Sequence, residues 1–156
     1  MIRIPNRAGF TEISYMPLVE NQTDFQYQKM RVLLVEDSIL LRETIMESLD
    51  GCFGLQFDGV AAKQSEAIAL LSQYQFDMLI VDIQLAEGNG FEVLKATQAE
   101  SYQFDRPIYV ILTNHAYPQY RLLAKKLDVD YFFDKSLDFD LAIETIESEA
   151  RKFALR

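Results

Sequence analysis

Five polar side chains come directly, or almost directly, after short runs of apolar residues: Glu36, Asp37, Asp82, Thr113 and Lys135. Taken singly, each has an ordinary explanation, because an acidic residue or a threonine after a strand commonly caps the next helix. Taken together, they supply three carboxylates, one hydroxyl and one amine. Such a set can hold an ion and a phosphoryl group if the fold gathers its members at one place.

Three carboxylates that lie close together repel one another, which costs stability and raises the pKa of some of them. A divalent cation relieves that repulsion. The chain has one histidine and one cysteine, so a site with several nitrogen or sulfur ligands is excluded. Oxygen ligands suit a hard ion, and Mg²⁺ is the natural choice because it uses one or two carboxylates together with water and phosphate oxygens.

A carboxylate can also attack phosphorus and form an aspartyl phosphate. A bound cation offsets the charge of the phosphoryl group, while an ammonium and a hydroxyl can hold its remaining oxygens. The five residues therefore include every group needed to transfer a phosphoryl group to an aspartate.

The elements that must position these residues alternate along the chain. Strands are predicted at Arg31–Val35, Leu55–Val60, Met78–Val81, Ile108–Leu112 and Tyr131–Phe133. Helices are predicted over 41–49, 67–74, 91–98, 118–127 and 139–153. Buried strands that alternate with amphipathic helices predict an α/β fold, in which a doubly wound, five-stranded parallel sheet has helices on both faces. Since ligands of such sheets bind at the carboxyl ends of the strands, we expect the five polar residues to meet there.

Four motifs follow one another in order from Met30 onward: Val32-Leu33-Leu34-Val35-Glu36-Asp37-Ser38, Leu79-Ile80-Val81-Asp82 with Gly88 and Gly90 after it, Ile111-Leu112-Thr113, and Phe132-Phe133-Asp134-Lys135. With this ordered set the chain resembles the receiver domain of two-component response regulators. The resemblance implies the flavodoxin-like receiver fold with strand order 2-1-3-4-5.

The resemblance also implies a role for each candidate residue. Asp82 would be the phosphoacceptor, and Mg²⁺ would be bound by Glu36, Asp37, Asp82 and the main-chain carbonyl of Gln84. Thr113 and Lys135 would bind the phosphoryl oxygens, and Phe132 would be the aromatic residue of the switch. Gln84 and His115 would influence how fast the phosphoryl group is hydrolysed.

The function implied by the resemblance is that of a single-domain response regulator in a phosphorelay. Asp82 would receive its phosphoryl group from a histidine kinase or a phosphotransfer protein. No output domain is expected in the sequence, so the signal would pass through protein contacts with a downstream target or a second copy. The expected contact surface comprises the fourth helix, fifth strand and fifth helix. The chain would not be an enzyme beyond assisting its own Mg²⁺-dependent phosphorylation and dephosphorylation.

Two other functions remain open from the residues. A phosphatase similar to the haloacid dehalogenase group also combines an aspartate, a threonine, a lysine and Mg²⁺ on a parallel sheet. That group requires a second aspartate two positions after the nucleophile, where this chain has Gln84. It also places its acidic pair after the lysine, whereas Glu36 and Asp37 precede it. The third candidate is a receiver-like interaction module that is not phosphorylated.

The net charge and the composition limit the classes of partner that the chain can bind. The formal net charge of −9 disfavours nucleic acid, whose phosphates require a surplus of lysine and arginine. We see neither an apolar run long enough for a membrane helix nor a signal peptide, and expect a cytoplasmic protein without membrane contact.

The first 29 residues differ from the rest because they contain two prolines and show no sustained periodicity. We interpret residues 1–29 as an irregular N-terminal arm and residues 30–156 as the receiver domain. The arm is either a disordered tail, upstream of a second start at Met30, or a segment that packs on the domain or a partner. Packing would use the aromatic residues Phe10, Tyr15, Phe25 and Tyr27.

Overall fold

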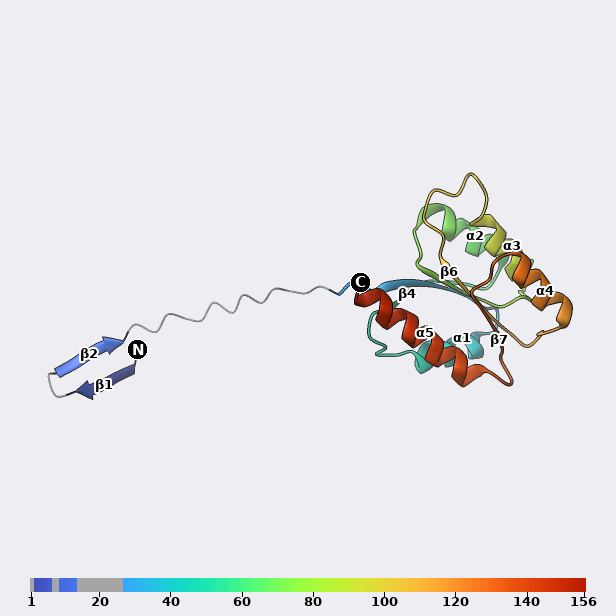
Figure 1. Ribbon diagram of the computed structural model, residues 1–156. Helices are drawn as coiled ribbons and strands as arrows, with labels where there is room; N and C mark the ends of the chain where they lie inside the picture. The colour runs from blue at the N-terminus through green and yellow to red at the C-terminus, as the bar shows by residue number, and fades with distance from the viewer. Residues whose placement is uncertain (1, 7–8, 14–26) are drawn as a thin grey trace.

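The apolar runs of the sequence form one five-stranded parallel sheet (Figure 1). The computed structural model describes residues 2–6, 9–13 and 27–156. The strands of the sheet are β3 (Met30–Val35), β4 (Leu55–Ala61), β5 (Met78–Val81), β6 (Ile108–Thr113) and β7 (Tyr131–Asp134). Their spatial order is β4-β3-β5-β6-β7. Counted from β3, this is the order 2-1-3-4-5, so the predicted fold class and topology are confirmed.

Five helices cover the two faces of this sheet: α1 (Ile39–Ser48), α2 (Gln64–Gln73), α3 (Gly90–Ala96), α4 (Pro118–Lys126) and α5 (Phe139–Ala154). In Figure 1, α1 and α5 lie on one face, and α2, α3 and α4 lie on the other. Successive strand side chains point to opposite faces. Val32 and Leu34 therefore join the core beneath α1 and α5, whereas Leu33 and Val35 join the core beneath α2, α3 and α4.

The exposure of each strand follows from its place in the sheet. All four residues of β5 are buried, because this strand lies inside the sheet and has helices on both faces. β4 is an edge strand and is only partly buried, as its alternating sequence predicts. Its Asp58 pairs with Arg31 of β3 at 2.5 Å, which places charge on the edge. Charged edges discourage pairing with another chain.

The N-terminal arm corrects one expectation. Residues expected to be irregular form an antiparallel hairpin of β1 (Ile2–Asn6) and β2 (Gly9–Ile13), in which Ile2 pairs with Ile13. β-Branched residues favour extended backbone, and their short alternation is easily missed when prolines lie nearby. Tyr15 and Phe25 lie outside the described residues, and only the backbone of Phe10 is described.

Tyr27, the fourth aromatic residue of the arm, packs on the α/β domain. Its ring meets Phe53 edge-on, with 5.1 Å between the ring centroids. Within the described part of the chain, no helix combines the length and the apolar character that crossing a membrane requires.

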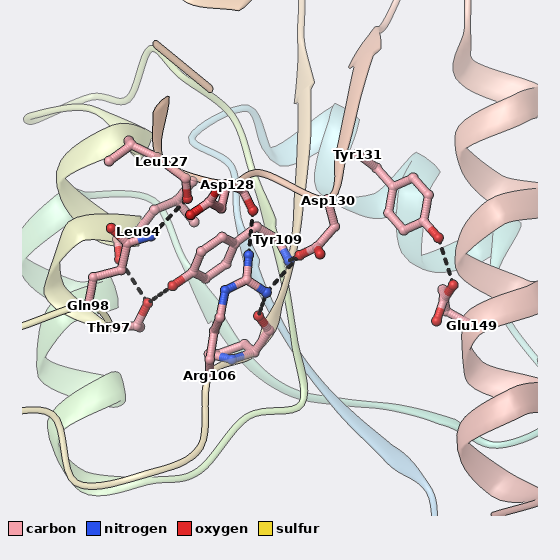
Figure 2. A network of polar contacts seen from close by, with 11 residues as sticks. Leu94, Thr97, Gln98, Arg106, Tyr109, Leu127, Asp128, Asp130, Tyr131 and Glu149 are labelled. Atoms are coloured by element: carbon pink, nitrogen blue, oxygen red, sulfur yellow. Dashed lines mark hydrogen bonds and ion pairs between the residues drawn. The ribbon is translucent and has the colours of Figure 1, made fainter. Parts of the chain in front are cut away.

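A polar network connects the α4–β7 loop to the start of β6 (Figure 2). The Arg106 guanidinium stacks 4.0 Å from the centroid of the Tyr109 ring. It donates hydrogen bonds to the Asp130 carboxylate at 3.0 Å and to the main-chain carbonyl of Asp128 at 2.5 Å. The same carboxylate of Asp130 accepts a hydrogen bond from the backbone N–H of Tyr109 at 2.7 Å. One arginine thus joins two loops far apart in sequence.

The C-terminal end of α4 is held by a second contact in the same view (Figure 2). The Gln98 side chain, just after α3, donates a hydrogen bond to the main-chain carbonyl of Leu127 at 2.8 Å. Beside it, the hydroxyls of Thr97 and Tyr109 lie 2.6 Å apart and are buried. At the other end of α4, the side chain of Tyr117 makes no capping hydrogen bond. The two ends of this helix are therefore held to different extents.

Tyr131 makes the stability of the domain depend on pH in the alkaline range. Its hydroxyl donates to the Glu149 carboxylate at 2.7 Å and so links β7 to α5 (Figure 2). This hydrogen bond, together with partial burial, raises the pKa of Tyr131 from 10.0 to about 12. Because the folded-state pKa lies above the unfolded one, the stabilisation is complete below pH 10 and is lost as the pH rises through 12.

We therefore expect Tyr131→Phe to lower the free energy of unfolding by about 1 kcal/mol at pH 8. The difference from the wild type should shrink as the pH rises from 10 towards 12. Urea unfolding of both proteins across this pH range measures the difference in the free energy of unfolding. All other titratable groups are the same in the two proteins, so their contributions cancel in the difference. A difference that stays constant with pH would contradict this assignment.

Candidate functional site

The carboxyl ends of the strands place four of the five candidate side chains in buried positions. The exposed fractions are 2% for Glu36, 8% for Asp82, 0% for Thr113 and 8% for Lys135. Asp37 is exposed at the rim. Backbone hydrogen bonds hold these residues in register. The N–H of Asp82 donates to the carbonyl of Val35, the last residue of β3, and the N–H of Lys135 donates to the carbonyl of Thr113, both at 2.9 Å. The sheet edge thus provides one polar cluster surrounded by apolar strands.

Lys135 is the centre of that cluster. Its Nζ lies 2.5 Å from Glu36 Oε2 and 2.8 Å from Asp82 Oδ2. Burial alone would favour the neutral amine, but the hydrogen bonds and charges of the two carboxylates outweigh it and raise the pKa of Lys135. The lysine therefore remains a cation that partly balances two buried anions.

Glu36 is held from two sides. Lys135 binds one of its oxygens, and the backbone N–H of Ser38 donates to the other at 3.0 Å. Burial raises the pKa of Glu36, and the two hydrogen bonds lower it only in part. Ser38 also caps α1, because its hydroxyl accepts from the N–H of Leu41 at 3.3 Å. The acidic pair is thereby fixed to the start of a helix.

Asp82 has one oxygen without a partner. Oδ2 accepts from Lys135, whereas Oδ1 is buried and finds no hydrogen bond among the described residues. A buried carboxylate oxygen without a partner is costly. Carboxylate oxygens of Glu36, Asp37 and Asp82 all lie within 4.8 Å of one another. An all-oxygen donor set with an unsatisfied member fits a hard divalent cation such as Mg²⁺.

Gln84 lies two residues beyond Asp82 in the connection that leads to α3. Its side chain is exposed, and its backbone pairs with Asn89 in an isolated antiparallel bridge. The N–H of Gly90 donates to the carbonyl of Ile83 at 2.9 Å. The connection therefore closes on itself next to the acidic cluster.

Thr113 and His115 are linked directly. The Thr113 hydroxyl accepts a hydrogen bond from the backbone N–H of His115 at 3.1 Å. The His115 ring lies 5.8 Å from the Tyr117 ring, between centroids. His115 is thus partly covered by its own loop, and the threonine hydroxyl constrains the path of that loop.

Phe132 is half-buried on β7 and packs against the core beneath α4. The Arg121 guanidinium lies over its ring, 4.6 Å from the centroid. We did not predict this contact from the sequence, because nothing in the spacing of Arg121 and Phe132 shows that α4 and β7 face each other. A cation stacked on an aromatic face stabilises the position of that ring.

The parallel sheet and the acidic cluster at its carboxyl edge define an α/β domain of the receiver type. Residues 32–147 match the family described as the response regulator receiver domain, and the chain belongs to this family. This confirms the expected class. Phosphorylation and Mg²⁺ binding are typical of the family, whose members are signalling domains of two-component systems.

Relatives and solved structures agree with this assignment. The sensory transduction protein LytT of Bacillus cereus is 29% identical over 118 residues, which cover 76% of this chain and 46% of that protein. The chain therefore spans less than half the length of this relative. The receiver domain of HemR from Leptospira biflexa is 32% identical with a TM-score of 0.62, over 77% of this chain and 95% of that domain. The response regulator domain of CheB from Thermotoga maritima has a TM-score of 0.67 at 20% identity, and the match covers 83% of this chain and 98% of that domain. At this identity the match shows the fold alone.

Proposed function

We propose that the chain accepts a phosphoryl group on Asp82 from a histidine kinase or phosphotransfer protein, in the cytoplasm. The observation that supports this most is the state of Asp82 itself. One oxygen of this buried carboxylate is held by Lys135, and the other has no partner among the described residues. A carboxylate in that state can bind a cation and attack a phosphorus atom.

The residues around Asp82 would have different roles in the transfer of the phosphoryl group. Glu36, Asp37, Asp82 and the carbonyl of Gln84 would hold Mg²⁺, which when bound offsets charge on the carboxylates and on the phosphoryl oxygens. The Asp82 carboxylate attacks phosphorus while the bond to the donor's imidazole nitrogen breaks. The Lys135 ammonium and the Thr113 hydroxyl hold phosphoryl oxygens, and their charge and dipole favour the transition state.

We further propose that Thr113 and Phe132 form the switch. A move of the Thr113 hydroxyl towards the phosphoryl group would break its hydrogen bond from His115 and release the start of the following loop. Phe132 would then fill the vacated space and leave its position beneath Arg121. Structures with and without a phosphoryl mimic test this, and unchanged positions of Thr113 and Phe132 would exclude it.

The output would be a protein contact on the surface of α4, β7 and α5. Leucines on this surface are strongly exposed, with exposed fractions of 56% for Leu122, 84% for Leu137 and 54% for Leu141. A contact on this surface would bury these leucines, which lie on α4, in the turn after β7 and on α5. The occupant would be a downstream protein or a second copy of the chain, and not nucleic acid.

The test is incubation with a small acyl phosphate and Mg²⁺, followed by the intact mass of the protein. A single stoichiometric phosphoryl adduct that requires Mg²⁺ supports the receiver function. Sustained turnover of varied phosphate esters without an adduct would support a phosphatase instead. A protein that neither forms an adduct nor turns over substrate would be an interaction module.

The lifetime of the adduct should depend on Gln84 and His115. Both lie on the loops that border Asp82, where they shape the path of the attacking water. We expect Gln84→Ala and His115→Ala each to change the rate of dephosphorylation by about threefold or more, the effect that corresponds to one net hydrogen bond. Loss of the adduct is followed by mass after removal of the acyl phosphate. An unchanged rate in both variants would exclude the role.

A further inference from the structure

The first two residues of α2 make three hydrogen bonds with the connection between β5 and α3. The backbone N–H of Gln64 donates to the carbonyl of Glu87 at 2.9 Å. Its side-chain oxygen accepts from the backbone N–H of Asn89 at 3.0 Å. The neighbouring Ser65 hydroxyl donates to the Glu87 carboxylate at 2.9 Å. The start of α2 is thus bound to a loop more than twenty residues away in sequence.

The loop is shaped to receive this glutamine. Gly88 lies between the two contacts and has φ +75°, a conformation that side chains rarely adopt. A Cβ atom at Gly88 would also overlap with the side chain of Gln64. Glycine is therefore required here both by the backbone and by the close approach of Gln64.

The bound part of the loop leads directly to the acidic cluster. Asn89, whose N–H Gln64 holds, is bridged to Gln84 on the opposite side of the loop. Gln84 carries the main-chain carbonyl that, in the function proposed above, binds Mg²⁺ beside Asp82. One hydrogen bond and one bridge therefore separate the Gln64 side chain from that ligand.

We propose that Gln64 is a positioning residue for the magnesium site, which it serves by fixing the loop that carries the Gln84 carbonyl. This inference rests on the proposed function, because it assumes that the cation is bound there. Groups that hold a metal ligand in place from behind keep it oriented before the metal binds, so this order need not be created on binding. Without the acceptor on Gln64, the N–H of Asn89 turns to water and the loop has more conformations to lose.

The test compares Gln64→Met, which keeps the length of the side chain but removes the acceptor, with the wild type. Mn²⁺ replaces Mg²⁺, and the electron paramagnetic resonance signal of free Mn²⁺ gives the dissociation constant of the unphosphorylated protein. We expect binding by Gln64→Met to be about fivefold weaker, the loss that corresponds to one net hydrogen bond. Amide hydrogen exchange at Asn89 should become faster in the same variant.

Three further variants make the result decisive. Gln64→Glu keeps an acceptor oxygen and should bind Mn²⁺ within twofold of the wild type, in 0.3 M KCl to screen the added charge. Gln73→Met, at the exposed end of the same helix, should also match the wild type. Asp37→Ala removes a proposed ligand and should weaken binding strongly.

The outcomes separate the two proposals. If the wild type fails to bind Mn²⁺, the proposed metal site itself is wrong. If the wild type binds, Asp37→Ala does not and Gln64→Met binds as the wild type does, only the positioning role is overturned. Urea unfolding without metal must show that Gln64→Met retains its fold. If Gln64→Met does not fold, Gln64→Ala replaces it in the test, and we expect the same loss of affinity for Mn²⁺.

Discussion

Changing Asp82 to asparagine will abolish phosphoryl incorporation from an acyl phosphate. The amide has nearly the same shape and still offers an oxygen to Lys135, which lies 2.8 Å from Asp82 Oδ2. It lacks the negative charge that makes a carboxylate a nucleophile towards phosphorus. Intact mass after incubation with Mg²⁺ measures the fraction of protein that carries the adduct.

The matched control is Asp50→Asn. Asp50 is an exposed aspartate just after α1, so its substitution leaves the site unchanged and the adduct should form as in the wild type. An adduct of equal yield on Asp82→Asn would show that another side chain is modified and would remove the central residue of the proposed function.

Changing Lys135 to methionine will destabilise the domain by about 3–5 kcal/mol in the absence of divalent cations. The variant keeps the length of the side chain but leaves the carboxylates of Glu36 and Asp82 buried without their cation. Mg²⁺ should restore part of the loss, because a ligand that binds only the folded state stabilises it. The loss should also be smaller in acid, where the raised pKa of Glu36 lets that carboxylate take up a proton.

Urea unfolding with EDTA and with Mg²⁺ measures both effects. Lys152→Met is the matched control, because Lys152 is an exposed lysine that pairs with Glu149 at 3.4 Å within one helix. Such surface pairs contribute about 0.5 kcal/mol. Equal stabilities of Lys135→Met and Lys152→Met would show that the buried cluster does not depend on its lysine.

The fold was predictable because each strand and helix has its own local pattern. Met78–Val81 is apolar at every position and therefore predicts a strand buried on both faces, which β5 is. Parallel order then brings the strand ends together, so the gathering of Glu36, Asp82 and Lys135 could be expected from sequence alone. The hairpin at residues 2–13 was missed because its short strands carry too few residues for a clear period.

Contacts between helices and loops were beyond prediction for another physical reason. Gln64 reaches Asn89, and Arg121 covers Phe132, only because the sheet sets the distance between the elements that carry them. Nothing in the local sequence of a surface glutamine or arginine distinguishes these residues from solvated ones. The spare oxygen of Asp82 is likewise visible only once its neighbours are in place.

The unequal ends of α4 have a mechanical consequence. Its C-terminal end is fastened to Gln98 and, through the following loop, to Arg106, whereas its N-terminal end follows the loop that the Thr113 hydroxyl constrains. If the N-terminal end of α4 is displaced while its C-terminal end stays in place, the helix must rotate about its C-terminal end. The nine residues of α4 span about 13 Å, so a displacement of about 2 Å at Pro118 corresponds to a swing of roughly 9°. In the switch proposed above, α4 would turn about its C-terminal end, which lies near the amino-terminal ends of the strands and away from the carboxylates.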